Sequence, residues 1–528
     1  MMIRFVASVL ALRVGFATLA AAHAADAKGT TLRFIPQADL RVLDPVWTTA
    51  NITRDHGYMI YDTLFALDEH LKPQPQMVDK WSVSEDKLTY SFTLRDQLKF
   101  HDGAPVRPAD CIASLERWMK RDILGQSLAE AVGEMKAADD RTFSIVLKKP
   151  FPLLLQALAK ISGSMPFIMP ERVAKTDPNT QIKEAIGSGP FKFVAAEWEP
   201  GHKVVYVKNT DYVPRREKPS WASGGKVVKV DRVEWIYIPD PSTAANALLA
   251  GEIDWWWQVP PDLVPLLEKR GGVTVAATDP IGFSGVFRFN HLHPPFDNVK
   301  IRLAVLGALD QTDYMTAVAG DKRFWRTCYS FYTCGTPMAS EVGAEALKGK
   351  RDLAKARALI KEAGYNGERV VVMDASDYSA VHAEALVTAD LLQRLGLNVD
   401  LQTSDWGTVL TRRAKRSAVE DGGWSVLHTS FTGPDAIDPS VNQGLRANGD
   451  KAWFGWPTDP EIEALHDRWL DSEDPAAQKE IAAALQAEAF RTVPYIPIGQ
   501  FAIPTAYRNN LSGLISSPVL EMWNVEKR

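Results

Sequence analysis

Two histidine-containing segments carry residue types that could do chemistry. His291 and His293 stand two residues apart, so in an extended segment both imidazoles would lie on one side and could ligate a metal ion. The double proline that follows favours a loop instead, with one histidine stacked and the other solvated. His101 and Asp102 have the residue types of part of a catalytic triad, but glycine and proline follow, which is typical of a turn. We therefore expect neither a metal site nor a triad.

The sequence lacks the nucleophile and zinc motifs typical of extracytoplasmic hydrolases and the loop that holds phosphates. It contains no Gly-x-Ser-x-Gly nucleophile motif, no His-Glu-x-x-His zinc motif and no Gly-x-x-x-x-Gly-Lys-Ser/Thr phosphate loop. Sixty Lys and Arg residues face 65 Asp and Glu residues, a net charge of -5 with no long run of either sign. That balance argues against a nucleic-acid groove or an anionic membrane surface. We predict a protein that is not an enzyme and needs no cofactor; an extracytoplasmic hydrolase is the alternative from another class.

Residues 1–24 have the pattern of a cleavable export signal. Arg4 and Arg13 are basic, residues 14–22 are small and apolar, and a small-x-small cleavage pattern precedes Ala25. The apolar run is shorter than the roughly 20 residues that span a bilayer. No cysteine stands just after the cleavage pattern to accept a lipid. The sequence therefore predicts a free periplasmic protein.

The three cysteines fall into two environments. Cys328 and Cys334 flank five residues of a turn-prone segment, and an oxidising compartment favours a disulfide between them over two reduced, half-buried thiols. Cys111 lies in an amphipathic helical pattern, which indicates a small core residue.

The residues that could do chemistry belong to a chain of 528 residues in which strand, helix and turn signals alternate. A chain of this length exceeds one ordinary hydrophobic core, and we expect about two to four packed units of mixed α and β structure. Strict apolar alternation predicts a strand over 88–94, followed by a second strand through Leu98 and Phe100. The spacing then becomes helical over 108–120. This part is predicted to be a small antiparallel unit with a helix attached.

Two strand-helix-strand units are predicted further along, each with a right-handed crossover. In the first, Asp240 and the proline after it supply a helix start, and Gly251 follows the helix end. Two separate open sheets are implied, and ligands bind preferentially at domain interfaces and at the carboxyl ends of strands. The other predicted elements are a strand pair over 191–194 and 203–207, strands over 230–238 and 253–257, a unit over 369–373, 380–395 and 398–402, and helices over 459–471 and 475–491.

Several stretches resemble a known family. The most specific is DKLTYSFTLRDQLKFHDGAPVRPADCIASLERW, from Asp86 to Trp118, which is similar to the signature of the family 5 solute-binding proteins of ABC importers. That family includes dipeptide-, oligopeptide- and nickel-binding proteins. Further similar stretches run over 187–212, 230–255 and 290–310.

The resemblance implies an α/β, periplasmic-binding-protein-like two-lobed fold of type II, with an extra α+β domain inserted in the first lobe. Two crossings between the lobes would form a hinge, and ligand binding would stabilise a closed form that a membrane permease recognises. Mapped onto this chain, the implied division is a signal peptide over 1–24, lobe I over 25–69, 188–285 and 496–528, the extra domain over 70–187, and lobe II over 286–495.

The function implied by the resemblance is capture of a short peptide or peptide-like solute in the interlobe cleft and delivery to an inner-membrane ABC permease. A monomer without nucleic-acid partners is expected. Because a fold does not set specificity, an opine, a sugar, haem or a nickel chelate is the alternative ligand. A sensor subunit that reports ligand occupancy to a membrane partner has the same sequence features.

In peptide-binding relatives, an aspartate a few residues after an aromatic residue holds the α-amine of the ligand. The matching segment here contains Phe431, Thr432 and Asp435, with Asp435 three residues before an Asp-Pro pair. It departs from the family pattern because Phe431 replaces tryptophan and Pro434 is inserted. Asp435 is thus the expected ligand anchor, with Phe431 and Thr432 beside it, and an Asx-turn cap is the structural alternative.

The remaining residues that could contact a ligand are tryptophans and arginines. Trp406 follows the strand over 398–402 and is expected to stack on the ligand, or else to pack in the core. The run over 255–257 contains three tryptophans, for which packing is expected, with at most one or two lining a cleft. No motif chooses among the arginines that could pair with a ligand carboxylate, namely Arg326, Arg412 and Arg413.

Overall fold

The structure, a computed structural model, describes residues 30–528 and contains two large sheets, one smaller four-stranded sheet and three two-stranded sheets. The predicted export signal lies outside the described residues. Among residues 30–528, no helix is both long and apolar enough to cross a membrane.

The first large sheet has seven strands. Its centre is β1, which pairs in parallel with β12 on one side and with β13 on the other. Helix α6 (Pro241–Ala250) connects β12 to β13; Asp240 caps it by accepting the Thr243 N–H, and Gly251 ends it at a φ of 81°. The predicted strand-helix-strand unit is confirmed. In spatial order the strands are β10 (Phe191–Phe193), β11 (Lys203–Lys208), β12 (Arg232–Ile236), β1 (Thr31–Ile35), β13 (Trp255–Trp256), β21 (Thr505–Arg508) and β14 (Val273–Ala276).

The second large sheet has six strands. Helix α12 (Ser379–Arg394) joins two parallel strands, β17 and β18, which confirms the second predicted unit. In spatial order the strands are β16 (Trp325–Arg326), β20 (Tyr495–Phe501), β15 (Phe283–Phe289), β19 (Val426–Thr432), β17 (Arg369–Ala375) and β18 (Asn398–Ser404). The other long helices of this region are α8 (Val299–Ala308), α9 (Gln311–Ala319), α11 (Leu353–Glu362), α14 (Pro460–Leu470) and α15 (Pro475–Thr492).

The smaller sheet is antiparallel and has four strands, in the order β5 (Val78–Val83), β6 (Thr89–Leu94), β8 (Thr142–Leu147) and β7 (Val132–Ala137). Helices α2 (Pro108–Met119) and α3 (Ile123–Ala131) accompany it. The strand through Leu98 and Phe100 was predicted wrongly, since only an isolated bridge between Lys99 and Pro105 forms. The physical reason is that the chain reverses at Gly103 (φ 88°), and proline has no N–H with which to extend a ladder.

Helix α1 (Asn51–Ile60) is almost completely buried next to the seven-stranded sheet. Short strands β2 (Asp62–Thr63) and β9 (Phe167–Ile168) pair with each other and tie the start of the smaller-sheet region to its end. Other short elements are β3 (Phe65–Leu67), β4 (Pro73–Pro75), β22 (Leu511–Ser512), β23 (Glu526–Lys527), α4 (Leu154–Leu158), α5 (Glu171–Ala174), α7 (Val264–Lys269), α10 (Glu345–Lys348) and α13 (Trp406–Arg412).

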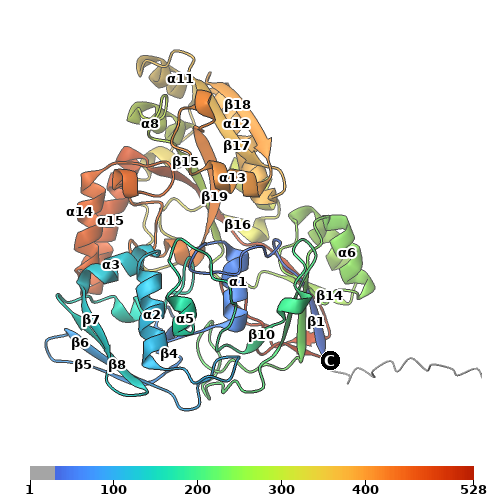
Figure 1. Ribbon diagram of the computed structural model, residues 1–528. Coiled ribbons are helices and arrows are strands. Elements are labelled where there is room, and N and C mark those ends of the chain that lie inside the picture. The colour runs from blue at the N-terminus through green and yellow to red at the C-terminus, as the bar shows by residue number, and fades with distance from the viewer. Residues whose placement is uncertain (1–29) are drawn as a thin grey trace, which may run out of the picture.

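The two large sheets lie in different parts of the molecule, and the chain passes between them twice. In Figure 1 the six-stranded sheet forms the upper part, the seven-stranded sheet lies at the lower right and the four-stranded sheet at the lower left. The two connecting segments, called hinge segments below after their predicted role, are residues 277–282, between β14 and β15, and residues 502–504, between β20 and β21. The predicted boundaries at 285 and 496 fall inside β15 and β20, and the division into domains stays a prediction.

Candidate functional site

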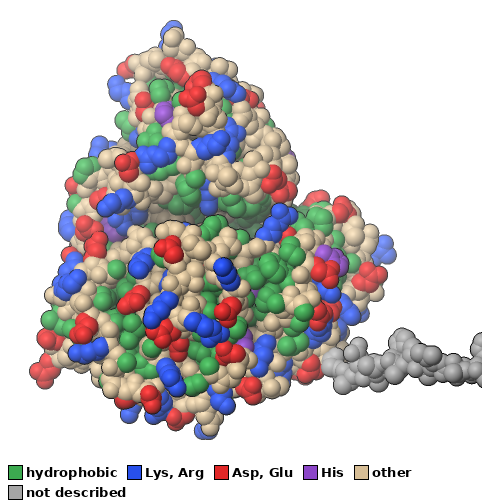
Figure 2. Space-filling model, in the orientation of Figure 1, with side chains coloured by type: hydrophobic (Ala, Val, Ile, Leu, Met, Phe, Trp, Pro, Cys, Tyr) green, Lys and Arg blue, Asp and Glu red, His purple; other side chains and the backbone are tan. Residues whose placement is uncertain are grey.

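A cleft lies where the two large sheets face each other, beside both hinge segments. Figure 2 shows a hollow between the upper part and the lower body of the molecule. Two adjoining chambers occupy the cleft, and Gln37, Gln258 and Ile503 line both of them. The chambers are therefore two ends of one binding space.

One end, which we call the apolar chamber, encloses about 180 Å³. Apolar groups from both sides of the cleft dominate its wall, so it suits an apolar side chain. Its main lining residues are Tyr237 and Trp256 from the seven-stranded side, Val318 and Tyr378 from the six-stranded side, and Phe501 and Pro504 around the second hinge segment.

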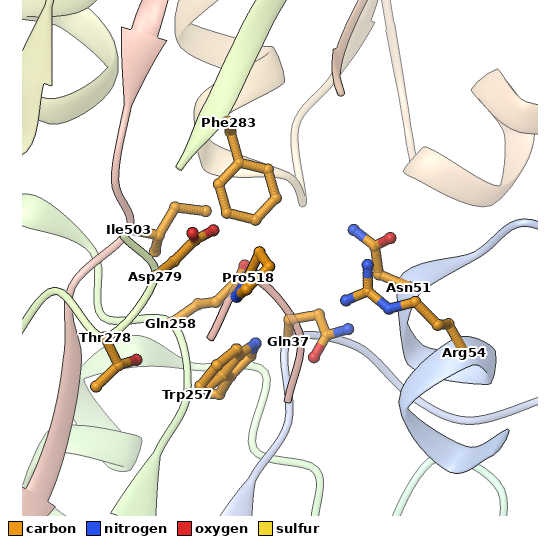
Figure 3. A pocket seen from close by; sticks show the side chains of 10 residues that line it. All are labelled: Gln37, Asn51, Arg54, Trp257, Gln258, Thr278, Asp279, Phe283, Ile503 and Pro518. Atoms are coloured by element: carbon orange, nitrogen blue, oxygen red, sulfur yellow. The ribbon is translucent and has the colours of Figure 1, made fainter. Parts of the chain in front are cut away.

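The other end, which we call the polar chamber, contains Asn51, Arg54, Trp257, Asp279 and Phe283 in addition to the shared residues. Figure 3 shows the carboxylate of Asp279 and the guanidinium of Arg54 on opposite sides of it. A carboxylate, a guanidinium and side-chain amides around one space suit a solute that carries charges of both signs.

Arg54 is held in place by helix α1 and by two partners. Its Nε and Nη2 donate to Asp55 Oδ1 at 3.0 and 2.9 Å, and its Nη1 donates to Ser162 Oγ at 3.0 Å. Burial acts to lower the pKa of Arg54, but the carboxylates of Asp55 and Asp435 outweigh it and raise the pKa above its ordinary value. Arg54 therefore stays charged in the buried site.

Ser162 links this arginine to residues of the opposite side of the cleft. Its hydroxyl lies 2.9 Å from Thr432 Oγ1 and 3.0 Å from Asp435 Oδ2, and Thr432 Oγ1 donates to the same carboxylate oxygen at 2.6 Å. Arg54, Ser162, Thr432 and Asp435 form what we call the interlobe network. Thr432 and Asp435, two of the residues expected at the site from the sequence, are thus joined through Ser162 to Arg54, although neither is among the residues that line the two chambers.

The loop that carries Asp435 is supported by the disulfide loop. Asp435 lies in a short 3-10 turn, Gly433–Ala436, directly after β19. Thr333 donates from its backbone N to Ala436 O at 2.9 Å and from Oγ1 to Gly433 O at 2.8 Å. Thr333 precedes Cys334, which is bonded to Cys328 as the spacing predicts. The disulfide loop therefore positions the turn that presents the Asp435 carboxylate.

Asp279 lies in the first hinge segment. Its Oδ1 accepts the backbone N–H groups of Ile281 and Gly282 at 2.9 and 2.8 Å. Its Oδ2 is buried and has no hydrogen-bond partner within residues 30–528. Burial raises the pKa of Asp279, and the two backbone N–H groups and Arg54 oppose that effect. The carboxylate is thus only half satisfied.

The structure places Phe431 and Trp406 away from the chamber walls. Phe431 is 5% exposed and packs edge-on against Trp453 and Tyr495 inside the six-stranded side. Trp406 packs edge-on against Tyr378, which itself lines the apolar chamber. Any contact of either residue with a ligand stays a prediction.

The three consecutive tryptophans divide between core and cleft. Trp255 is 2% exposed and packs on Phe34, as expected for a core residue. Trp256 lines the apolar chamber and Trp257 the polar chamber. Packing thus describes Trp255, and two of the three tryptophans line the cleft, which is the upper limit of the prediction. The alternation of a strand indicated that one or two of them could face a cleft.

Arg54 and Asp279 were missed from the sequence. The only signal for Arg54 was its position directly before Asp55, and Asp279 had none, because no strand was predicted between residues 257 and 369. The three candidate arginines make contacts within their own side instead. Arg326 donates to Cys334 O, Arg412 donates to the Gly422 and Gly423 carbonyls, and Arg413 lies over the Phe454 ring.

The two histidines that could have ligated a metal ion contact backbone carbonyls instead. His291 and His293 lie at the backbone carbonyls of Pro494 and Arg416, at 3.1 and 2.7 Å. No group of three or more His, Cys, Asp or Glu side chains in the described part of the chain could hold a metal ion. Cys111 is a buried free thiol whose pKa is raised by burial.

Comparison with known proteins shows which family the chain resembles. Residues 72–452 match the family model described as bacterial extracellular solute-binding proteins, family 5 middle. A probable peptide ABC transporter periplasmic-binding protein, y4tO of Sinorhizobium fredii, is 40% identical over 97% of this chain and 96% of its own length. The glutathione-binding protein GsiB of Escherichia coli K12 is 24% identical over 91% of both chains.

Solved structures agree on the fold. The binding protein AgaA from A. tumefaciens R10, in complex with agropinic acid, has a TM-score of 0.79 at 23% identity, covering 94% of this chain and 99% of that one. A dipeptide-binding protein from a Pseudoalteromonas species, in complex with Met-Leu, has a TM-score of 0.75 at 20% identity, covering 94% and 100%. The two-lobed, type II binding-protein architecture expected from the sequence is confirmed, and the chain belongs to family 5 of the bacterial extracellular solute-binding proteins.

Proposed function

We propose that the protein is the periplasmic binding component of an ABC importer and captures a short peptide or peptide-like solute between its lobes. The lobes close over the solute, and the closed form delivers it to a membrane permease. In this proposal the protein acts as a monomer, is exported by residues 1–24 and carries out no catalysis. The 40% identical relative named as a peptide-transport protein supports the solute class.

The observation that carries the proposal is the interlobe network around Asp435. The carboxylate accepts hydrogen bonds at Oδ2 from both Ser162 and Thr432. Within residues 30–528, no hydrogen bond engages Oδ1. A carboxylate with one oxygen free beside a cleft suits the ammonium group of a peptide, because a charge-assisted hydrogen bond of this kind is about twice as strong as a neutral one.

The apolar chamber supports a solute that also carries an apolar side chain. Its volume of about 180 Å³ is large enough for an aromatic or branched aliphatic group. The two chambers share a wall, so one small molecule could occupy both. An opine, which joins an amino-acid-like head to a second moiety, is the second candidate, because an agropinic acid complex is among the similar folds.

The experiment compares free and N-acetylated dipeptides by isothermal titration calorimetry on ligand-free protein. We expect the free peptides to bind more tightly by about 10- to 100-fold, since acetylation removes the charged hydrogen-bond donor. The Asp435→Asn variant should lose that discrimination. Asp450→Asn, at a surface carboxylate paired with Arg416, is the matched control and should keep it.

Two outcomes would overturn the proposal. If free and acetylated peptides bind equally to the unmodified protein, no amine is recognised. If neither binds while a peptide-free solute does, the solute class is wrong. Recovery of the peptide intact after prolonged incubation is expected for a binding protein, whereas turnover would support a hydrolase. Loss of peptide uptake in cells without the gene would support transport over sensing alone.

A further inference from the structure

Asp279 has a carboxyl group in the first hinge segment that the contacts of the protein leave incompletely satisfied. Its Oδ1 is engaged by the two backbone N–H groups that follow it, while Oδ2 is buried without a partner within the described residues. A buried carboxylate oxygen without a hydrogen bond costs free energy because it has lost its water. The form of the protein in which the cleft is closed around Asp279 therefore carries an uncompensated acceptor.

The surroundings of Asp279 select the kind of group that could satisfy it. The polar chamber has a free volume of about 10 Å³, which is space for about one water-sized group. Aromatic rings of Trp257 and Phe283 form part of its wall, together with the side chain of Gln258, all labelled in Figure 3. A primary ammonium is compact and is attracted to aromatic faces as well as to a carboxylate. A planar guanidinium is larger than the space.

The charges around the chamber also favour positive charge from outside. Arg54 is the one cation among the chamber-lining residues, and it is paired with Asp55. Lys160 lies near the Asp435 loop but is itself paired with Asp122. Asp435 and Asp279 then share the influence of Arg54 with Asp55, and neither forms an ion pair of its own within the described residues. One ammonium at Asp435 would still leave Asp279 uncompensated.

We propose that Asp279 binds a second primary ammonium of the solute, so that the protein prefers peptides or peptide-like solutes with a lysine-type side chain in addition to a free amino end. This inference rests on the proposed function and names its solute class more narrowly.

The position of Asp279 links this recognition to closure. Oδ2 is enclosed on all sides, so the ammonium must enter while the lobes are apart and be covered as they close. Asp279 lies within residues 277–282, which connect the two sheets, and its Oδ1 caps the turn at Ile281 and Gly282. The solute therefore stabilises the closed form by more than the open one, which is the condition for ligand-driven closure.

The test compares Ala-Lys with Ala-norleucine, which has the same chain length without the ammonium, and with Ala-Arg. Unmodified protein should bind Ala-Lys about 10- to 100-fold more tightly than Ala-norleucine, and more tightly than Ala-Arg. In Asp279→Asn the amide oxygen can still cap the two N–H groups, and the preference for lysine should disappear. Asp310→Asn, at a carboxylate that likewise caps a backbone N–H, is the matched control and should retain the preference.

The outcomes separate this inference from the proposed function. If Ala-Lys and Ala-norleucine bind equally tightly to unmodified protein, or if Asp279→Asn keeps the preference, Asp279 does not bind an ammonium although peptide capture stands. If neither peptide binds while other solute classes do, the proposed function itself fails. Should Asp279→Asn not fold, the comparison of the three peptides on unmodified protein still decides whether a side-chain ammonium is recognised.

Discussion

The interlobe network makes a quantitative prediction for Ser162→Ala. Ser162 follows α4 and lies shortly before β9, which pairs with β2 near α1, so Ser162 and Arg54 belong to the same side of the cleft. The hydrogen bond between Arg54 and Ser162 should therefore exist in open and closed forms alike. The contacts of Ser162 with Thr432 and Asp435 join the two sides of the cleft. We expect them to form only on closure.

Only the contact that crosses the cleft affects ligand affinity. A hydrogen bond to a charged group contributes about 1.5–3 kcal/mol. Losing one in the closed form alone raises the apparent dissociation constant by about 10- to 150-fold, at 1.4 kcal/mol per factor of ten. The bond to Arg54 is lost in both forms, so it lowers overall stability without changing affinity.

The assay is isothermal titration calorimetry with a peptide found by thermal shift, alongside urea unfolding. Ser164→Ala is the matched control, because Ser164 is also buried and its hydroxyl donates to Pro45 O, at 3.2 Å, on the same side of the cleft. It should lower stability and leave the dissociation constant unchanged. A dissociation constant for Ser162→Ala within about twofold of the unmodified value would refute the role of the network in closure.

Three further predictions follow from buried groups. Burial raises the pKa of Glu521 to about 8 from an ordinary 4.5, so stability should fall as pH rises through that window, by at most about 1.4 kcal/mol per pH unit. Glu521→Gln should flatten the profile in urea unfolding, and an unchanged slope would contradict the burial argument. Replacing Cys328 and Cys334 by serine should cost about 2 kcal/mol of stability and weaken peptide binding, because Thr333 would no longer be held against the turn of Asp435; calorimetry showing equal affinity would exclude that support. Trp256→Ala should lower the ratio of affinities for Ala-Phe and Ala-Gly, since Trp256 lines the apolar chamber, and an unchanged ratio would place the apolar side chain elsewhere.

Elements with local signals were predictable from the sequence. Helix α6 has both a capping aspartate, Asp240, and a terminating glycine, Gly251, and it forms at the predicted place. Strand β6 shows strict alternation and forms as expected. The strand through Leu98 failed because its apolar pattern is short and the turn that reverses the chain decides the pairing instead.

The site was predictable only in part, because it is assembled from distant segments. Asp435 and Thr432 were proposed through their likeness to a family pattern; the structure joins them to Ser162 across the two sides of the molecule, and their contact with a ligand stays a prediction. Arg54 is 108 positions from Ser162, and no sequence spacing indicates that contact. Asp279 was identified only from the structure, because the burial of its Oδ2 without a hydrogen-bond partner depends on how the hinge segment packs.

The most direct test of the account is native mass spectrometry of the purified protein, followed by identification of the released solute. We predict one bound molecule per monomer, with a mass in the range of a short peptide or an amino-acid conjugate and with at least one primary amine that reacts with an amine-specific reagent. A bound solute with no amine or other cationic group would contradict recognition by the carboxylates of the cleft.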